Sequence, residues 1–125
     1  MQLVFYRAKG NEMLSIEERY ELFKNTIEEC GTDILSESEE VIEYKLFDEF
    51  AVDAISFLHE NMLDALLKEG MVDDEIYEKC KELRNYYLSM QPSSLLKCGR
   101  EVKRSAEWKK LMGLSDEIRK KIGFH

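Results

Sequence analysis

Apolar side chains recur at steps of three and four residues along most of the chain, the spacing of helices that bury one face. The first such stretch opens with Ser15 and Glu18, the two residues of a capping box. It closes at Gly31, because glycine readily ends a helix. Its inward positions are Ile16, Tyr20, Phe23 (or Leu22) and Ile27.

A second helical pattern begins at Ser36, which forms another start signal with Glu39, and continues to Gly70. Helices in globular proteins usually have about 8 to 20 residues, and this pattern is longer. We therefore expect a kink or break between Tyr44 and Asp48, with Asp48 as the new cap. One apolar stripe in its later part should face the core: Phe47, Phe50, Ala51, Ala54, Leu58, Met62, Ala65 and Leu66.

Two further helices are predicted toward the carboxyl end. One starts at Asp73 or Asp74 and ends near Met90, because Pro92 disfavours helical geometry at the residue before it. A short helical piece follows from Ser94. The last helix runs over 105–122, with Gly113 as a weak point or break. The expected inward residues are Ile76, Cys80, Leu83 and Tyr87 in the first, and Ala106, Trp108, Leu111, Met112, Leu114 and Ile118 in the last.

These patterns predict an all-α fold. Only Met1 to Arg7 has strand character, and one strand without a partner forms no sheet. With 125 residues and a single proline, the chain suits one domain spanning 1–125, built as a bundle of four to five helices. We expect a monomer whose core includes Phe23, Phe50, Leu58, Leu83 and Trp108.

The sequence also indicates the compartment. No apolar run approaches the roughly 18 to 20 residues that span a bilayer. The segment from Met1 to Arg7 places its positive charge after the apolar residues, the reverse of a secretory signal. Cys30, Cys80 and Cys98 are odd in number and far apart, so we expect free thiols. A cytoplasmic protein without a membrane helix is predicted.

Charge is distributed unevenly within the net total of −8. Residues 1–80 hold 7 basic and 21 acidic side chains, a balance of −14, and residues 81–125 hold 11 and 5, a balance of +6. The acidic part should repel nucleic acid and attract basic partners. The basic part could bind phosphate, but packing against the acidic half of the same chain is the simpler interpretation.

The sequence lacks recognisable catalytic or metal-binding motifs. His59 has no glutamate three residues away, and no two cysteines lie within four residues of each other, so helical-bundle and zinc metal sites are unsupported. Phosphate-binding glycine loops and the nucleophile elbow are missing as well. A Cys–His pair formed in space stays possible, but a structural role for His59 is favoured. We expect no enzyme activity and no cofactor.

One set of residues is a candidate partner-binding surface: Glu49, Asp53, Glu60 and Asp64, with Phe57 in the middle of the row. Counted at 100° per residue, the four carboxylates lie within about 60° of one another on a continuous helix. An aromatic anchor ringed by charges is typical of a protein interface. The alternative is that Phe57 packs under a neighbouring helix while the acids are solvated. A second acidic cluster (Glu37, Glu39, Glu40 and Glu43) also suits a helix amino terminus.

A small acidic protein without catalytic residues fits an inhibitor of a basic enzyme, and nucleases are basic because their substrate is a polyanion. In whole-chain character and in the tail from Ser105 to Ile118 (SAEWKKLMGLSDEI), the chain resembles immunity proteins of bacterial contact-dependent growth inhibition systems. The resemblance implies a cytosolic protein that binds the carboxy-terminal domain of its cognate toxin and blocks the active site. A tRNA nuclease is the expected toxin.

A second class of function stays open, namely a helical adaptor or regulatory subunit that binds a cellular protein or nucleic acid. Its nucleic-acid form depends on a dense basic stretch, which on an acidic protein is more often an internal salt-bridge partner or a solvated face. For the immunity function we expect no direct contact with nucleic acid. The residues of the basic stretch are Lys97, Arg100, Lys103, Arg104, Lys109 and Lys110.

Overall fold

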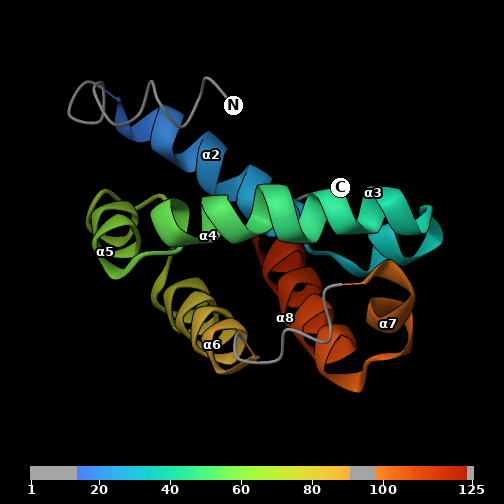
Figure 1. Ribbon diagram of the computed structural model, residues 1–125. Helices are drawn as coiled ribbons and strands as arrows, with labels where there is room; N and C mark the ends of the chain where they lie inside the picture. The colour runs from blue at the N-terminus through green and yellow to red at the C-terminus, as the bar shows by residue number, and fades with distance from the viewer. Residues whose placement is uncertain (1–13, 91–97, 124–125) are drawn as a thin grey trace.

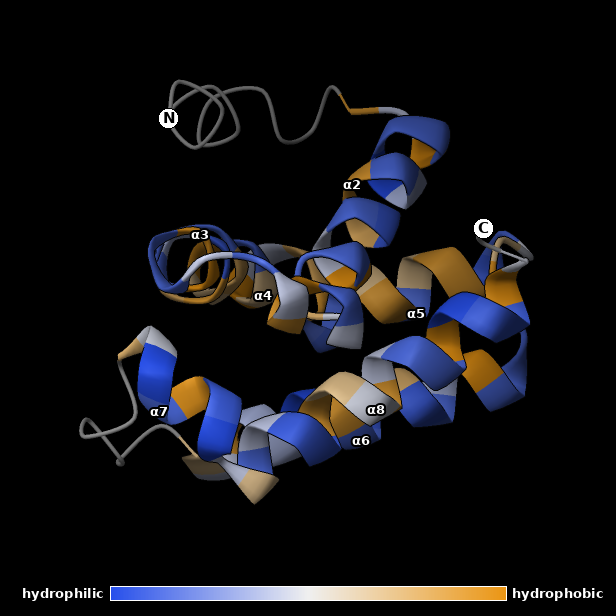
Figure 2. Cartoon of the chain, turned by 90° about the vertical axis from the view of Figure 1, so that its right-hand side faces the viewer, coloured by the Kyte–Doolittle hydropathy of each residue, from blue (hydrophilic) through white to orange (hydrophobic). Residues whose placement is uncertain are grey.

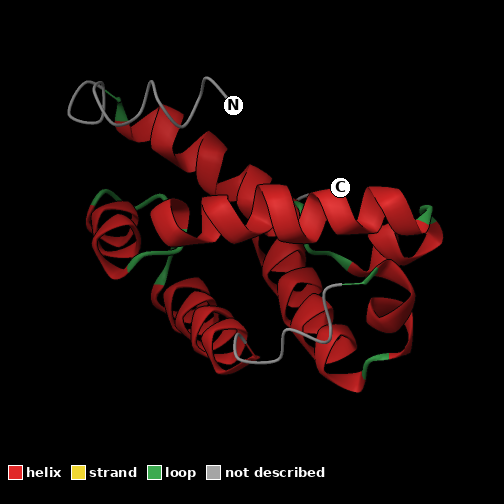
Figure 3. Ribbon diagram, viewed as in Figure 1, coloured by secondary structure: helices red, strands yellow, loops and turns green. Residues whose placement is uncertain are grey.

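The computed structural model describes residues 14–90 and 98–123, which form six helices and no strand when 39–57 is counted as one helix (Figures 1 and 3). The all-α, single-domain prediction is confirmed, with one helix more than expected. The predicted strand character of Met1 to Arg7, the helical piece from Ser94 and the boundary at Pro92 fall outside the described residues.

The elements follow one another along the chain with short connections. They are α2 (Ile16–Glu28), the 3-10 helix η2 (Thr32–Ser36), α3 (Glu39–Glu43), the π-helical segment η3 (Tyr44–Phe50), α4 (Ala51–Phe57), α5 (Glu60–Lys68), α6 (Asp74–Met90), α7 (Gly99–Arg104) and α8 (Ala106–Ile122). No helix among them is long and apolar enough to cross a membrane, a finding that covers the described residues alone.

Side-chain caps start three of the helices where the sequence predicts them: Ser15 for α2, Asp73 for α6 and Ser105 for α8. Ser15 forms the full capping box at α2, and the Ser105 hydroxyl accepts the Trp108 N–H at α8. The start predicted at Ser36 is wrong. The Ser36 hydroxyl donates to the Asp33 carbonyl within η2, so the next serine, Ser38, caps α3 instead.

The long helix formed by α3, η3 and α4 does not break where a kink was predicted. Asp48 lies inside the π-helical segment and caps nothing. Apart from Phe57, the buried residues of this helix and its carboxyl-terminal cap recur every four positions: Ile42, Leu46, Phe50, Ala54 and Leu58. In an α-helix each step of four turns the side chain by about 40°, so this stripe would rotate out of the core. The wider turn of a π-helix offsets that drift and keeps the stripe facing inward.

The break comes later, between α4 and α5. His59 is extended, with φ −65° and ψ 148°, and its Nδ1 atom accepts the Asn61 N–H at 3.0 Å. The histidine therefore acts as the amino-terminal cap of α5. Since α5 starts in a new direction, the helix predicted to continue through this region is two helices (Figure 1).

The helices pack around one hydrophobic core. α6 and α8 lie against each other, α2 contacts α4, α5 and α8, and α7 contacts α3 and α8 (Figure 1). The helices carry both polar and apolar residues, with the apolar ones gathered on one side (Figure 2). Edge-to-face ring contacts join the long helix to the core, with centroids 5.0 Å apart for Phe50 and Tyr87 and 5.8 Å apart for Phe47 and Trp108.

All five residues predicted for the core are buried: Phe23, Phe50, Leu58, Leu83 and Trp108. Two predictions for the last helix are wrong. Ala106 is exposed, because it occupies the first turn beside the cap, and α8 continues through Gly113 without a break. The packing on both sides of Gly113, at Met112 and Leu114, holds the helix through the weaker position.

Candidate functional site

The row of carboxylates predicted from the sequence is divided by the break at His59. Glu49 and Asp53 lie on the long helix, whereas Glu60 and Asp64 lie on α5. The prediction of one common face assumed a continuous helix, but the helix ends before His59, which caps the next helix. The four side chains therefore form two separate groups.

Phe57 does not lie on an exposed face. Its side chain is only 2% exposed, so it packs under neighbouring residues, which was the alternative considered. A group that is already buried offers no surface to a partner. The expectation of Phe57 as an exposed aromatic anchor is corrected accordingly.

The structure adds Glu29 to the Glu49 and Asp53 pair. Glu29 caps the carboxyl end of α2, and its side chain turns toward α4. Burial, a hydrogen bond to Asp53 and the negative charges of Asp53 and Glu49 together raise the pKa of Glu29 to about 9, while Lys45 acts in the opposite direction. Glu29 is therefore protonated at neutral pH, and it donates its proton to a hydrogen bond with Asp53.

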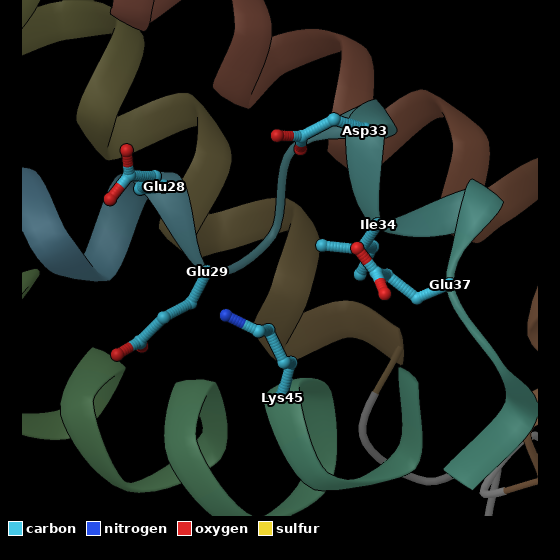
Figure 4. Close-up of a pocket in the computed structure, with 6 residues that line it drawn as sticks. All are labelled: Glu28, Glu29, Asp33, Ile34, Glu37 and Lys45. Atoms are coloured by element: carbon cyan, nitrogen blue, oxygen red, sulfur yellow. The ribbon is translucent and has the colours of Figure 1, made fainter. Parts of the chain in front are cut away.

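Glu29 and Lys45 line a surface pocket of about 170 Å³ between the end of α2, η2 and the start of η3 (Figure 4). The Lys45 side chain extends between Glu29 on one side and Ile34 and Glu37 on the other (Figure 4). Four carboxyl groups and one ammonium group share the lining, so the pocket has an excess of acidic groups. Its lining residues are Glu28, Glu29, Asp33, Ile34, Glu37 and Lys45.

Contacts with α8 hold the η2 wall of the pocket. The Asp116 carboxylate accepts hydrogen bonds from both the backbone N–H and the hydroxyl of Thr32. Arg119 lies 3.5 Å from Asp33. A Cβ atom at Gly31 would lie 2.6 Å from the Arg119 guanidinium, so a side chain there would displace that group. The acidic wall is thus fixed by tertiary contacts from a distant helix.

The second carboxylate group ties α5 to α6. The Tyr77 hydroxyl donates to Asp64 at 2.6 Å. This hydrogen bond raises the pKa of Tyr77 to about 12, with smaller contributions from the negative charges of Asp64 and Glu60. Asp64 therefore has a bonding partner within the protein, and it lies on a different helix from the pocket.

The basic side chains of residues 81–125 fall into two groups, those paired with carboxylates and those without such a partner among the described residues. Some of these cations pair with acids of the earlier helices: Lys121 lies 2.7 Å from Glu75, and Arg119 pairs with Asp33. Those on α7 and the first turns of α8 do not. Five exposed cations of α7 and early α8 have no carboxylate partner within 4 Å among the described residues: Arg100, Lys103, Arg104, Lys109 and Lys110. Lys110 instead covers the ring of Tyr86 at 4.9 Å. Lys97, the remaining member of the predicted basic stretch, lies outside the described residues.

The cysteines are free thiols, and two of them are fully buried. Burial raises the pKa of both Cys30 and Cys80 to about 12, so these thiols keep their protons at neutral pH and are poor nucleophiles. Cys98 is half-buried at the start of α7. In the parts of the chain that the structure describes, no group of three or more His, Cys, Asp or Glu is arranged to hold a metal ion.

Sequence reasoning missed the central residue of the pocket. Glu29 stands two residues before a helix-ending glycine, and nothing in that position distinguishes it from the exposed Glu28. Glu37 was recognised in an acidic cluster, but its place near a helix start explained it locally. Only the approach of α4 to the end of α2 reveals the site.

Comparison with known proteins identified no matching family model, no matching curated protein and no matching solved structure.

Proposed function

We propose that the chain is an immunity protein, acting in the cytoplasm without catalytic activity of its own, that binds and neutralises a cognate toxin domain. The observation that carries the proposal is the acidic pocket at the end of α2. There burial, first, and then the hydrogen bond to Asp53 and the negative charges of Asp53 and Glu49 raise the pKa of Glu29 to about 9, so that it holds a proton at neutral pH. The negative charges of Asp53 and Glu49, which help to keep Glu29 protonated, also favour the binding of an external cation.

A lysine or arginine side chain of a basic partner is the guest that this site suits. Such a group would meet the carboxylates of Glu28, Asp33 and Glu37, while Ile34 offers an apolar wall to its aliphatic stem. Charge-assisted hydrogen bonds between guanidinium and carboxylate are among the stronger polar contacts available to proteins. Its arrival would also release the proton of Glu29, so binding should strengthen as pH rises.

A nuclease domain matches this requirement, because its cleft carries the cations that normally hold phosphate groups. The acidic pocket and its rim would occupy the cleft in place of the substrate. Complementary charge of this kind speeds association and selects partners more than it adds to affinity. The protein would act as a monomer within the complex, and it would bind no nucleic acid itself.

The direct test is co-expression with the toxin domain encoded immediately upstream of the gene, scoring growth and tRNA integrity. We expect protection from the wild-type chain. Failure to protect, or the lack of any toxin-like neighbour, would defeat the proposal.

A matched pair of charge reversals tests the choice of surface. Glu28 and Glu37 are both exposed at the pocket, and the double variant Glu28→Lys with Glu37→Lys should slow association at least tenfold at low salt and flatten its salt dependence. Glu69 and Glu78 are exposed elsewhere, so Glu69→Lys with Glu78→Lys makes the same change in net charge as a control. Equal effects of the two double variants would show that net charge, not the pocket, governs binding.

A further inference from the structure

Lys45 carries the positive charge among the residues that line the acidic pocket. Its side chain points into the pocket, between Glu29 on one side and Ile34 and Glu37 on the other (Figure 4). The side chain is half-buried, although lysine side chains are mostly exposed in proteins. A cation of the chain itself therefore already occupies the space that the partner's cation would enter.

The Lys45 ammonium group is not held by a close ion pair. Among the described residues, no carboxylate lies within 4 Å of it. Other lysines of the chain do form such pairs: Lys79 lies 3.0 Å from Glu117, and Lys121 lies 2.7 Å from Glu75. Lys45 therefore offsets the negative charge of the pocket without an ion pair that would have to break before it could leave.

Two carboxylates of the pocket are also without a close cation. Glu28 and Glu37 are exposed, and in the described part of the chain no basic side chain lies within 4 Å of either. Asp33 differs, since it pairs with Arg119 at 3.5 Å. A second cation could therefore reach both Glu28 and Glu37 once the Lys45 side chain has moved aside.

Only the side chain of Lys45 needs to move. Its backbone belongs to the π-helical segment η3, and the next residue, Leu46, is fully buried in the core. Lysine has a flexible four-carbon stem, so the ammonium group can turn toward the solvent while the helix stays in place. Segments of π-helix occur frequently at functional sites, which agrees with the position of η3 beside the pocket.

Resting on the proposed function, we infer that Lys45 is an internal occupant of the acidic pocket, which a lysine or arginine of the toxin displaces on binding. Because it is tethered to the chain, the Lys45 ammonium group competes with every cation that approaches. A free polyamine, or a basic side chain that makes no other contact, has to displace Lys45 unaided. A cognate toxin offsets this cost through the rest of its interface, so Lys45 makes the pocket selective for such a partner.

Titration of the isolated protein with methylguanidinium tests the displacement without the toxin. Lys45→Met removes the charge but keeps a side chain of similar length, so methylguanidinium should bind about fivefold more tightly. The chemical shifts of the Glu28 and Glu37 amides report this binding. Lys68→Met, at an exposed position of α5, makes the same change in net charge and should stay within about twofold of the wild type. Lys45→Gln should reproduce Lys45→Met, and circular dichroism checks that all three variants fold.

Acetylation of lysine side chains shows whether Lys45 itself moves. The half-buried Lys45 should react more slowly than the exposed Lys68 in the free protein. At saturating methylguanidinium the rate at Lys45 should rise, while the rate at Lys68 stays constant. An unchanged rate at Lys45 would show that it acts only through its charge and would overturn the inference. Equal affinity of the wild type and both Lys45 variants for methylguanidinium would overturn it as well.

Binding of the upstream-encoded toxin domain separates this inference from the proposed function. Lys45→Met should bind the domain about fivefold more tightly than the wild type, because no internal cation has to leave. If the domain binds both proteins equally, Lys45 stays in place in the complex, so this inference fails and the immunity function stands. If the domain binds neither protein, the proposed function fails, and the methylguanidinium measurements alone decide whether Lys45 is a displaceable occupant.

Discussion

The side chains of Glu29 and Asp53 share a hydrogen bond across the contact between the end of α2 and α4. Two carboxyl groups at this distance cannot both ionise readily, so one keeps its proton. Burial is the largest cause of the raised pKa of Glu29, and the proton therefore resides on Glu29. This pair is a titratable link between two helices at the rim of the candidate site.

Replacing Glu29 with glutamine should change how stability depends on pH. The folded-state pKa of Glu29 is about 9, above its ordinary value of 4.5. Its stabilising contribution is therefore complete below about pH 4.5 and is lost as pH rises toward 9 and above. Glu29→Gln cannot ionise, so its free energy of unfolding should fall less between pH 5 and 9, as measured by urea denaturation. Glu28→Gln, at an exposed neighbour, should keep the wild-type slope; the same slope in both variants would contradict the protonation of Glu29.

Alanine at two glycines should have opposite effects on stability. A Cβ atom at Gly99 would lie 2.5 Å from the Glu39 carbonyl oxygen, so Gly99→Ala should force α7 away from α3 and cost about 1–3 kcal/mol. At Gly113, inside α8, a Cβ atom would have nothing within 4 Å. Gly113→Ala should stabilise the protein by about 0.5–1 kcal/mol, because alanine favours a helix interior. Thermal and urea unfolding check both, and a stabilised Gly99→Ala would contradict the close approach of the two helices.

Titration with RNA and DNA separates the immunity function from the nucleic-acid-binding alternative. The exposed cations of α7 and early α8 lack carboxylate partners among the described residues, the observation that favours the alternative. We expect no binding even at low salt, since the rest of the chain is strongly acidic. Fluorescence anisotropy at several salt concentrations provides the measurement. Affinity that falls steeply as salt rises, and that Arg100→Ala with Arg104→Ala abolishes, would favour the alternative.

The proposal that the protein has no catalytic activity is tested by replacing Cys98 and His59, the candidate residues of a Cys–His pair. Cys98 makes no side-chain cap contact, and asparagine can replace His59 as the cap of α5. Cys98→Ala with His59→Asn should therefore keep both the fold and the protection. His59→Ala should instead cost about 0.5–2 kcal/mol of stability through the lost cap. Loss of protection in a folded Cys98 and His59 double variant would favour a catalytic Cys–His mechanism.

Local sequence rules predicted several features because their causes lie within a few residues. The Ser15 capping box, the cap at Ser105 and the burial of Phe23, Phe50 and Leu83 all follow from short-range spacing and helical periodicity. The all-α fold follows from the same periodicity.

Where the sequence pattern allowed two local structures, the packing of the core decided which one formed. A long helical pattern can relieve its drift by breaking or by widening one turn, and the core selected a π-helical turn at Tyr44–Phe50. The helix breaks at His59 instead. This break divides the predicted row of carboxylates, and the Phe57 side chain is buried.

The sequence by itself therefore determined the helices, most of the core and the acidic character of the first part of the chain, since periodicity and composition are local properties. The tertiary structure alone decided which acids act together. Glu29 and Asp53 are separated by 24 positions, and their interaction arises only when α2 packs on α4. A carboxyl group changes its protonation through burial and through charges near it in space, and neither is encoded at its own position.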